Sequence, residues 1–126
     1  MDKKKKFREI TFESGTKIIL GKDAESNDEL MKKFKGKKNK IIHTLAPGSP
    51  FCVIDNPNPR PEEIITSGAI VARYSQDWRN NKKDVLVSIF TGKDISKDKD
   101  MKIGTWKVKK QKSIKIKKED IEKQIK

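Results

Sequence analysis

The segment 84–91, DVLVSIFT, constrains the fold most, because apolar side chains occupy both its even and its odd positions. A strand with one solvated face alternates apolar and polar residues, whereas a strand buried on both faces does not. We therefore expect this segment to be a central, buried strand. The core around it must be lean, because only 33% of the residues are hydrophobic and 39% are charged.

The remaining apolar residues fall into short periodic segments that predict an α+β fold. Residues 7–20 alternate like a β-hairpin around Ser14 and Gly15, and residues 39–45 and 51–54 look like short strands. Two main helices are expected, from about Asn27 to Phe34 and from Pro61 to about Tyr74. Ser26 and Glu29 have the spacing of a capping box. We expect one compact domain over residues 1–126, with a mostly antiparallel sheet, a core at about 7–117 and basic extensions at both ends.

Residues 105–117 predict a second hairpin. Placing Trp106, Val108, Ile114 and Ile116 on one face requires a three-residue loop around Gln111, which pairs Trp106 with Ile116. Lys107 then opposes Lys115, with Lys109 beside them. Directly opposed like charges are destabilising, and a bound polyanion would relieve the repulsion. The alternative is that these lysines mark an edge strand and discourage pairing between molecules.

The positive charge is concentrated in a few segments. The net charge is +13, and residues 31–40 hold six lysines and no acid. Such a field attracts RNA, DNA, acidic protein or an anionic membrane face, although heat adaptation also enriches lysine. Lysine outnumbers arginine 27 to 4, which disfavours base-specific readout. The candidate nucleic-acid contacts are Lys22, Lys37, Lys38, Lys107, Lys109 and Lys115.

Several classes of protein and site are disfavoured. No apolar run approaches the ~20 residues of a membrane span, and MDKKKKF lacks the apolar region of a signal peptide. One cysteine and one histidine exclude an internal disulfide and make an all-protein zinc site implausible. We expect a cytoplasmic protein with no cofactor and no metal.

The stretch from Gly21 to Leu30 resembles a phosphate loop only superficially. It has one glycine before the helix, and Asp23 and Asp28 would repel a triphosphate. We expect Asn27 and Asp28 to cap the helix, with Lys22 touching a nucleic-acid phosphate from the edge of the loop.

Two further groups of residues have a functional and a structural interpretation. One group is the aromatic and basic cluster of Tyr74, Trp78 and Arg79, which could stack on single-stranded RNA. Alternatively, the two aromatic side chains could close the core. We favour the core for Tyr74 and leave both interpretations open for Trp78. His43 and Cys52 could form a nucleophilic pair, but no orienting group or oxyanion hole is recognisable. We therefore expect no catalysis.

Four segments together carry a resemblance to a known family. GKDAESND, IIHTLAPGSPFCVI, GAIVARYSQDWR and IGTWKVKKQKS follow in the order and spacing of the NFACT RNA-binding domain, NFACT-R, over about Phe7 to Ile116. In the large NFACT proteins this domain is one of several, and those proteins bind the stalled large ribosomal subunit and recruit tRNA. The chain looks like the solo form of the domain. The residues that match the family motifs are Gly21, Lys22, Asp23, Asn27, Asp28, His43, Pro47, Gly48, Ser49, Tyr74, Ser75, Gly104 and Thr105.

The resemblance implies non-enzymatic binding of tRNA or ribosomal RNA, in translation or ribosome quality control, with the ribosome as a further partner. His43 would lie at the surface with Gly48 and Ser49 and touch a phosphate or a base; the alternative is a partly buried histidine bonded to a backbone carbonyl. The segment IIHTLA departs from the family because it has no acid near the histidine. The alternative functions are a small RNA-processing or RNA-modifying enzyme centred on His43, and a basic adaptor that docks acidic protein or an anionic membrane. A solo eukaryotic member linked to DNA binding leaves DNA as an alternative polyanion.

Overall fold

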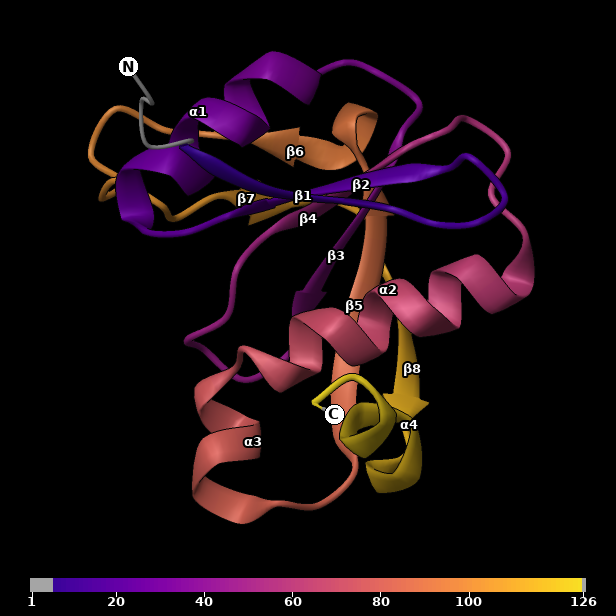
Figure 1. Ribbon diagram of the computed structural model, residues 1–126. Helices are drawn as coiled ribbons and strands as arrows, with labels where there is room; N and C mark the ends of the chain where they lie inside the picture. The colour runs from indigo at the N-terminus through magenta and orange to yellow at the C-terminus, as the bar shows by residue number, and fades with distance from the viewer. Residues whose placement is uncertain (1–5, 126) are drawn as a thin grey trace, which may run out of the picture.

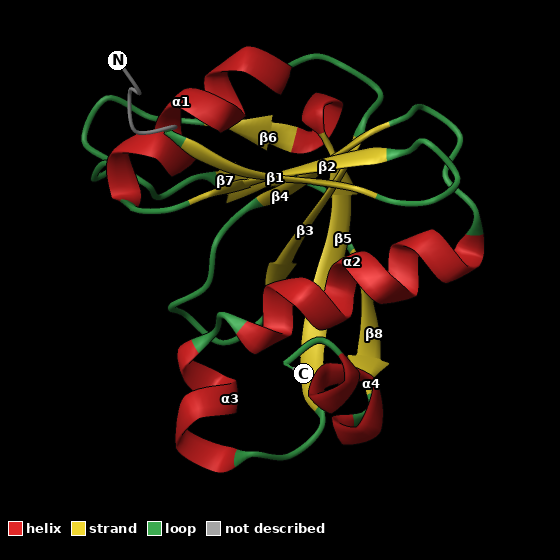
Figure 2. Cartoon of the chain, viewed as in Figure 1, coloured by secondary structure: helices red, strands yellow, loops and turns green. Residues whose placement is uncertain are grey.

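A six-stranded antiparallel sheet lies between helices on its two faces (Figures 1 and 2). The structure is a computed structural model and describes residues 6–125, so residues 1–5, most of the predicted N-terminal basic extension, lie outside it. The strand order is β1-β2-β4-β3-β5-β8. The strands of this sheet are β1 (Phe7–Thr11), β2 (Lys17–Gly21), β3 (Lys40–Thr44), β4 (Cys52–Asp55), β5 (Val85–Thr91) and β8 (Lys112–Ile116).

Four helices and a two-stranded sheet complete the described chain. The helices are α1 (Ala24–Phe34), α2 (Pro61–Arg73), α3 (Gln76–Asn81) and α4 (Lys118–Lys123). The smaller sheet pairs β6 (Ile95–Ser96), which follows the short 3-10 turn η1 (Gly92–Asp94), with β7 (Lys107–Val108). The predicted α+β fold with an antiparallel sheet is confirmed. None of the described helices is long and apolar enough to cross a membrane.

Each face of the sheet has its own hydrophobic core. Ile18 and Leu20 point toward α2, α3 and α4, where Ile121 of α4 is fully buried. Ile19, between them in the sequence, packs with α1 and β6 on the opposite face. The strands therefore alternate between two buried environments, as expected for strands covered on both sides.

The prediction that residues 84–91 form a central strand is confirmed, but the expected burial of both faces is wrong at Leu86. β5 pairs with β3 on one side and β8 on the other. Leu86 is 46% exposed, and Leu45, which donates its N–H to the Leu86 carbonyl at 3.1 Å, is 44% exposed. The layer formed by α1, β6 and β7 therefore leaves this end of the sheet open to solvent.

The first helix begins three residues earlier than the sequence indicated. Its N-cap is Asp23, whose Oδ1 accepts the Ser26 N–H at 2.8 Å, while Ser26 Oγ accepts the Asp23 N–H at 3.0 Å. The capping box predicted for Ser26 and Glu29 is therefore wrong, and Asn27 and Asp28 do not cap the helix. Ser26 fits both patterns in the sequence, and the fold selects the earlier one because β2 ends at Gly21 and leaves only Lys22 before the cap.

The predicted second hairpin is wrong. β7 pairs with β6, whereas β8 pairs with β5, so Lys107 lies opposite Ser96 and Lys115 lies opposite Leu86. Trp106 packs against the core on the α1 face, and Ile116 belongs to the core on the other face. The same alternation of apolar residues fits two strands of one hairpin and two strands in different sheets. β8 pairs with the free edge of β5 instead of with β7, so the strands lie in different sheets.

One buried carboxylate attaches the long loop of residues 97–106 to α1. Asp28, only 7% exposed, accepts at Oδ1 from the Gly104 N–H at 2.9 Å, Trp106 Nε1 at 3.0 Å and Lys97 Nζ at 3.0 Å. Burial alone would raise the pKa of Asp28, but these three donors outweigh it and hold that pKa below its usual value. Asp28 is thus an ionised anchor for the loop.

Replacing Asp28 with Ala should lower the free energy of unfolding at pH 7 by about 3 kcal/mol, because three donors lose their acceptor and Lys97 loses its counter-charge. Since the pKa of Asp28 is lower in the folded than in the unfolded chain, its stabilisation is complete above the unfolded pKa of about 3.9 and is lost as the pH falls through the folded value. Urea denaturation at pH 7 and pH 3 measures both effects. Asp100→Ala, an exposed acid in the same loop, is the control and should change stability by less than about 0.5 kcal/mol; equal losses in the two variants would contradict the anchor.

Candidate nucleic-acid interface

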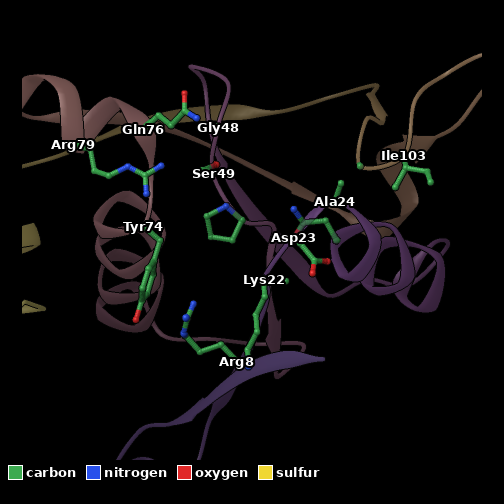
Figure 3. A pocket seen from close by; sticks show the side chains of 14 residues that line it. Arg8, Lys22, Asp23, Ala24, Gly48, Ser49, Tyr74, Gln76, Arg79 and Ile103 are labelled. Carbon is green, nitrogen blue, oxygen red and sulfur yellow. The ribbon is translucent and has the colours of Figure 1, made fainter. Parts of the chain in front are cut away.

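A cleft of about 500 Å³ lies where four distant stretches of the sequence meet. It is bounded by the start of α1, the β3–β4 loop, the α2–α3 junction and the 97–106 loop, and Figure 3 shows it from close by. Arg8 on β1 completes the lining. The lining residues are Arg8, Gly21, Lys22, Asp23, Ala24, Asn27, Gly48, Ser49, Pro50, Tyr74, Gln76, Arg79, Ile103 and Gly104.

Hydrogen bonds join these four stretches to one another. Asn27 Oδ1 accepts the Phe51 N–H at 3.1 Å, and a Cβ on Gly21 would lie 1.9 Å from that oxygen, so only glycine permits this approach. The Gln76 N–H donates to the Gly48 carbonyl at 2.8 Å. Together with the Asp28–Gly104 bond, these contacts fix the relative positions of all four stretches.

Cationic side chains dominate the cleft. Figure 3 shows the charged ends of Arg8 and Arg79 directed toward its middle, with Tyr74 on one wall and Asp23 on the opposite wall. The Arg8 guanidinium lies 4.1 Å from the centre of the Tyr74 ring, a cation–π contact that holds its planar group at the cleft. With Lys22, the lining has three cations and one acid, so the cleft suits an anion that contacts the arginines and avoids Asp23.

The start of α1 is a closed cap and offers few groups to a phosphate. Ser26 Oγ accepts the N–H groups of Lys22 and Asp23 at 2.7 and 3.0 Å, and Asp23 takes the Ser26 N–H. Hydrogen bonds from the Ser26 N–H and hydroxyl lower the pKa of Asp23, so its carboxylate stays charged. These contacts support a structural role for this turn over nucleotide binding.

A second hollow, of about 410 Å³, adjoins the cleft and contains His43. We call it the uncharged pocket, because its lining has no Asp, Glu, Lys or Arg. It shares Gly48, Ser49 and Gly104 with the cleft. The His43 ring stacks on Phe51 with centroids 4.3 Å apart, and Trp106 lines the same space.

His43 has no role as half of a nucleophilic pair in this arrangement. Cys52 is fully buried in the core on the α2 face, whereas His43 stacks on Phe51 on the α1 face, so the two side chains lie on opposite sides of the sheet. Burial raises the pKa of the Cys52 thiol far above its usual value. Burial also lowers the pKa of His43, and its contacts with the backbone at Ser49 and Thr44 offset this only in part. The imidazole is therefore neutral at physiological pH.

A third hollow, of about 670 Å³, gathers lysines from two distant segments. Lys40 on β3 lies there with Lys109, Lys110 and Lys112, and Asp94 is the one acid in the lining. We call it the lysine hollow; it shares Phe90 and Gln111 with the uncharged pocket. The loop that carries Lys37 and Lys38 is attached to η1, because the Gly36 N–H donates to the Gly92 carbonyl at 2.7 Å, but neither lysine lines the hollow.

Other residues singled out in the sequence lie elsewhere. Lys107 Nζ is 2.6 Å from Asp98, and Lys115 is on the open end of the sheet opposite Leu86. Trp78 is only 4% exposed and belongs to the core, so the interpretation of its ring as a stacking surface is wrong. Ser75 caps α3 by accepting the Trp78 N–H at 3.1 Å.

Sequence patterns do not indicate three of the residues that line the cleft or the uncharged pocket. Arg8 was assigned only to a hairpin, although its place among four arginines in a lysine-rich chain is a signal for specific anion contacts. Gln76 has no such signal, and Trp106 was placed in the wrong hairpin. Among residues 6–125, no three His, Cys, Asp or Glu side chains lie close enough together to hold a metal ion.

Comparison with known proteins agrees with this convergence of segments. A solved structure described as the C-terminal of the fibronectin/fibrinogen-binding protein from Streptococcus suis superposes with a TM-score of 0.81 at 25% identity. The similarity covers 97% of this chain and 50% of that chain, so this chain spans half the length of that solved one. No curated protein matches. The family model described as the NFACT protein RNA binding domain matches residues 6–110, which include all four motif segments except the end of the last. The chain therefore belongs to the NFACT protein RNA binding domain family.

Proposed function

We propose that this chain is a non-enzymatic RNA-binding domain that holds RNA along the cleft, the uncharged pocket and the lysine hollow. The single observation that carries this proposal is the meeting of the four family motifs at a cleft lined by Arg8, Lys22 and Arg79. Guanidinium groups bind phosphate through two parallel hydrogen bonds, so two arginines facing one cleft favour a phosphate backbone.

The lysine hollow adds a second region of contact. Its lysines come from segments about 70 residues apart and carry more positive charge than Asp94 can balance. Asp94 accepts bonds from the Thr91 N–H and hydroxyl at 3.0 Å, which orients it toward the backbone of its own turn. Lysines bind phosphate as point charges, so this region contributes affinity with little sequence preference.

The RNA that we propose is a structured one, tRNA or ribosomal RNA, bound in the cytoplasm during translation or ribosome quality control. The family supports RNA in general, and the +13 charge supports a large, highly charged partner such as the ribosome. The name of the similar Streptococcus suis protein refers to fibronectin and fibrinogen. An acidic protein surface is therefore the alternative partner that experiments must separate from RNA.

Reversing the charge of both cleft arginines, Arg8→Glu with Arg79→Glu, should weaken tRNA binding about tenfold or more and flatten the plot of log affinity against log salt by about 1.5, because two phosphate contacts are lost. Fluorescence anisotropy over 50 to 300 mM KCl measures both quantities. The control is Lys118→Glu with Lys123→Glu, two exposed positions on α4 that give the same change in net charge. Equal losses in the two double variants would show that net charge matters and the cleft does not.

Charge reversal in the lysine hollow, at Lys109, Lys110 and Lys112, should flatten the same salt dependence by about 2 to 3, since up to three phosphate contacts are removed. Reversal of Lys107 and Lys115 should have the smaller effect, because Lys107 already faces Asp98 and Lys115 is on the open end of the sheet. The reverse ranking would move the RNA surface to the region of Lys107 on β7 and Lys115 on β8.

Competition separates RNA from an acidic protein partner. A poly-glutamate peptide with the same number of charges as a tRNA should displace labelled tRNA only at much higher concentration, because carboxylates along a flexible chain cannot match phosphates held by structured RNA. Anionic vesicles serve as the second competitor and test the membrane alternative. Displacement by either competitor at concentrations equal to that of unlabelled tRNA would favour an adaptor over an RNA-binding domain.

A further inference from the structure

We propose that the uncharged pocket binds one unpaired nucleobase of the RNA, while the flanking phosphates lie in the cleft on one side and the lysine hollow on the other. This inference rests on the proposed function and adds the part of the RNA that is selected. It assigns a site around His43, Phe51 and Trp106. From the sequence alone, His43 was either a surface contact or a partly buried histidine.

The order of the three hollows supports a nucleotide-sized step. The uncharged pocket shares Gly48, Ser49 and Gly104 with the cleft, and Phe90 and Gln111 with the lysine hollow, so it lies between the two cationic regions. An RNA backbone that uses both regions must pass this pocket. From an RNA backbone on this path, the uncharged base is the group that can turn into the pocket.

The lining chemistry suits the face of a base. His43 lines the pocket and is partly exposed, and its ring stacks on Phe51. Phe51 in turn packs edge to face against Phe90, with 6.4 Å between the ring centroids, and this contact holds the Phe51 ring in place under His43. Rings of this kind stack on unpaired bases in RNA-binding proteins.

Trp106 forms another part of the lining and is held before any ligand arrives. Its Nε1 donates to the buried carboxylate of Asp28 at 3.0 Å, and the Lys97 ammonium lies 5.2 Å from its ring centre. A side chain locked in this way loses little conformational entropy on binding, which favours recognition.

Polar groups around the rim can bond the edge of the base. Ser88 donates its hydroxyl to Gln111 Oε1, and Ser49 Oγ accepts the Thr44 N–H at 3.1 Å, so both of these lining side chains have fixed positions. The volume of about 410 Å³ lies within the range of about 300–1,000 Å³ usual for small-ligand sites. A phosphate in the same place would meet no lysine or arginine, so the pocket favours an uncharged group.

The test compares two RNA duplexes that differ only in bases. Each carries a three-nucleotide 3′ overhang, uridines in one and abasic residues in the other, so both present the same number of phosphates. Wild-type protein should bind the uridine overhang about fivefold or more tightly, because one base stacks in the pocket. Equal affinity for the two duplexes would overturn the base pocket, and this comparison needs no variant.

Two variants then locate the site. His43→Ala should remove the preference for the uridine overhang without changing the salt dependence, and His43→Phe should keep most of it, because a phenyl ring still stacks. A preference that survives in His43→Ala would place the base elsewhere and overturn the assignment. The cleft variant with Arg8→Glu and Arg79→Glu should weaken both duplexes alike; if it binds both as wild type does, the proposed function fails, whereas failure of the overhang comparison alone leaves that function standing.

Discussion

The bond network of Asp28 is the constraint on which the candidate interface depends. One carboxylate, almost buried on α1, gathers donors from Lys97, Gly104 and Trp106, residues about 70 to 80 positions away. Gly104 lines both the cleft and the uncharged pocket, and Trp106 lines the pocket. An unpaired buried carboxylate would be costly, so the loop is held where it satisfies that charge, and the walls of both hollows are set by the same contact.

The RNA-binding mode that we propose separates affinity from selection. Arginines and lysines at the two ends supply electrostatic attraction that depends on salt and little on sequence. In this proposal, the uncharged pocket between them adds a contact that a paired base cannot make without leaving its helix. A lysine-rich domain can thereby prefer RNA with unpaired nucleotides without arginine forks that read base edges.

Local patterns predicted the elements well and their partners poorly. The start of α2 at Pro61 was correct. The pairing of Trp106 with Ile116 was wrong, because a period of two fixes which side chains share a face and leaves open which strand lies alongside. The burial of Trp78 could not be predicted either, because a tryptophan next to an arginine in the sequence fits both a core residue and a residue that stacks on a base.

The sequence by itself determined the α+β class, the central strand and the surplus of positive charge, because periodicity and composition are local properties of the chain. It also carried the four motifs, whose order identifies the family. Only the tertiary structure decided that those motifs meet at one cleft, that Arg8 joins them, and that Lys40 shares a hollow with Lys109, Lys110 and Lys112. These are contacts between residues far apart in sequence, and their formation depends on strand order and on buried bonds such as those of Asp28, which no local pattern specifies.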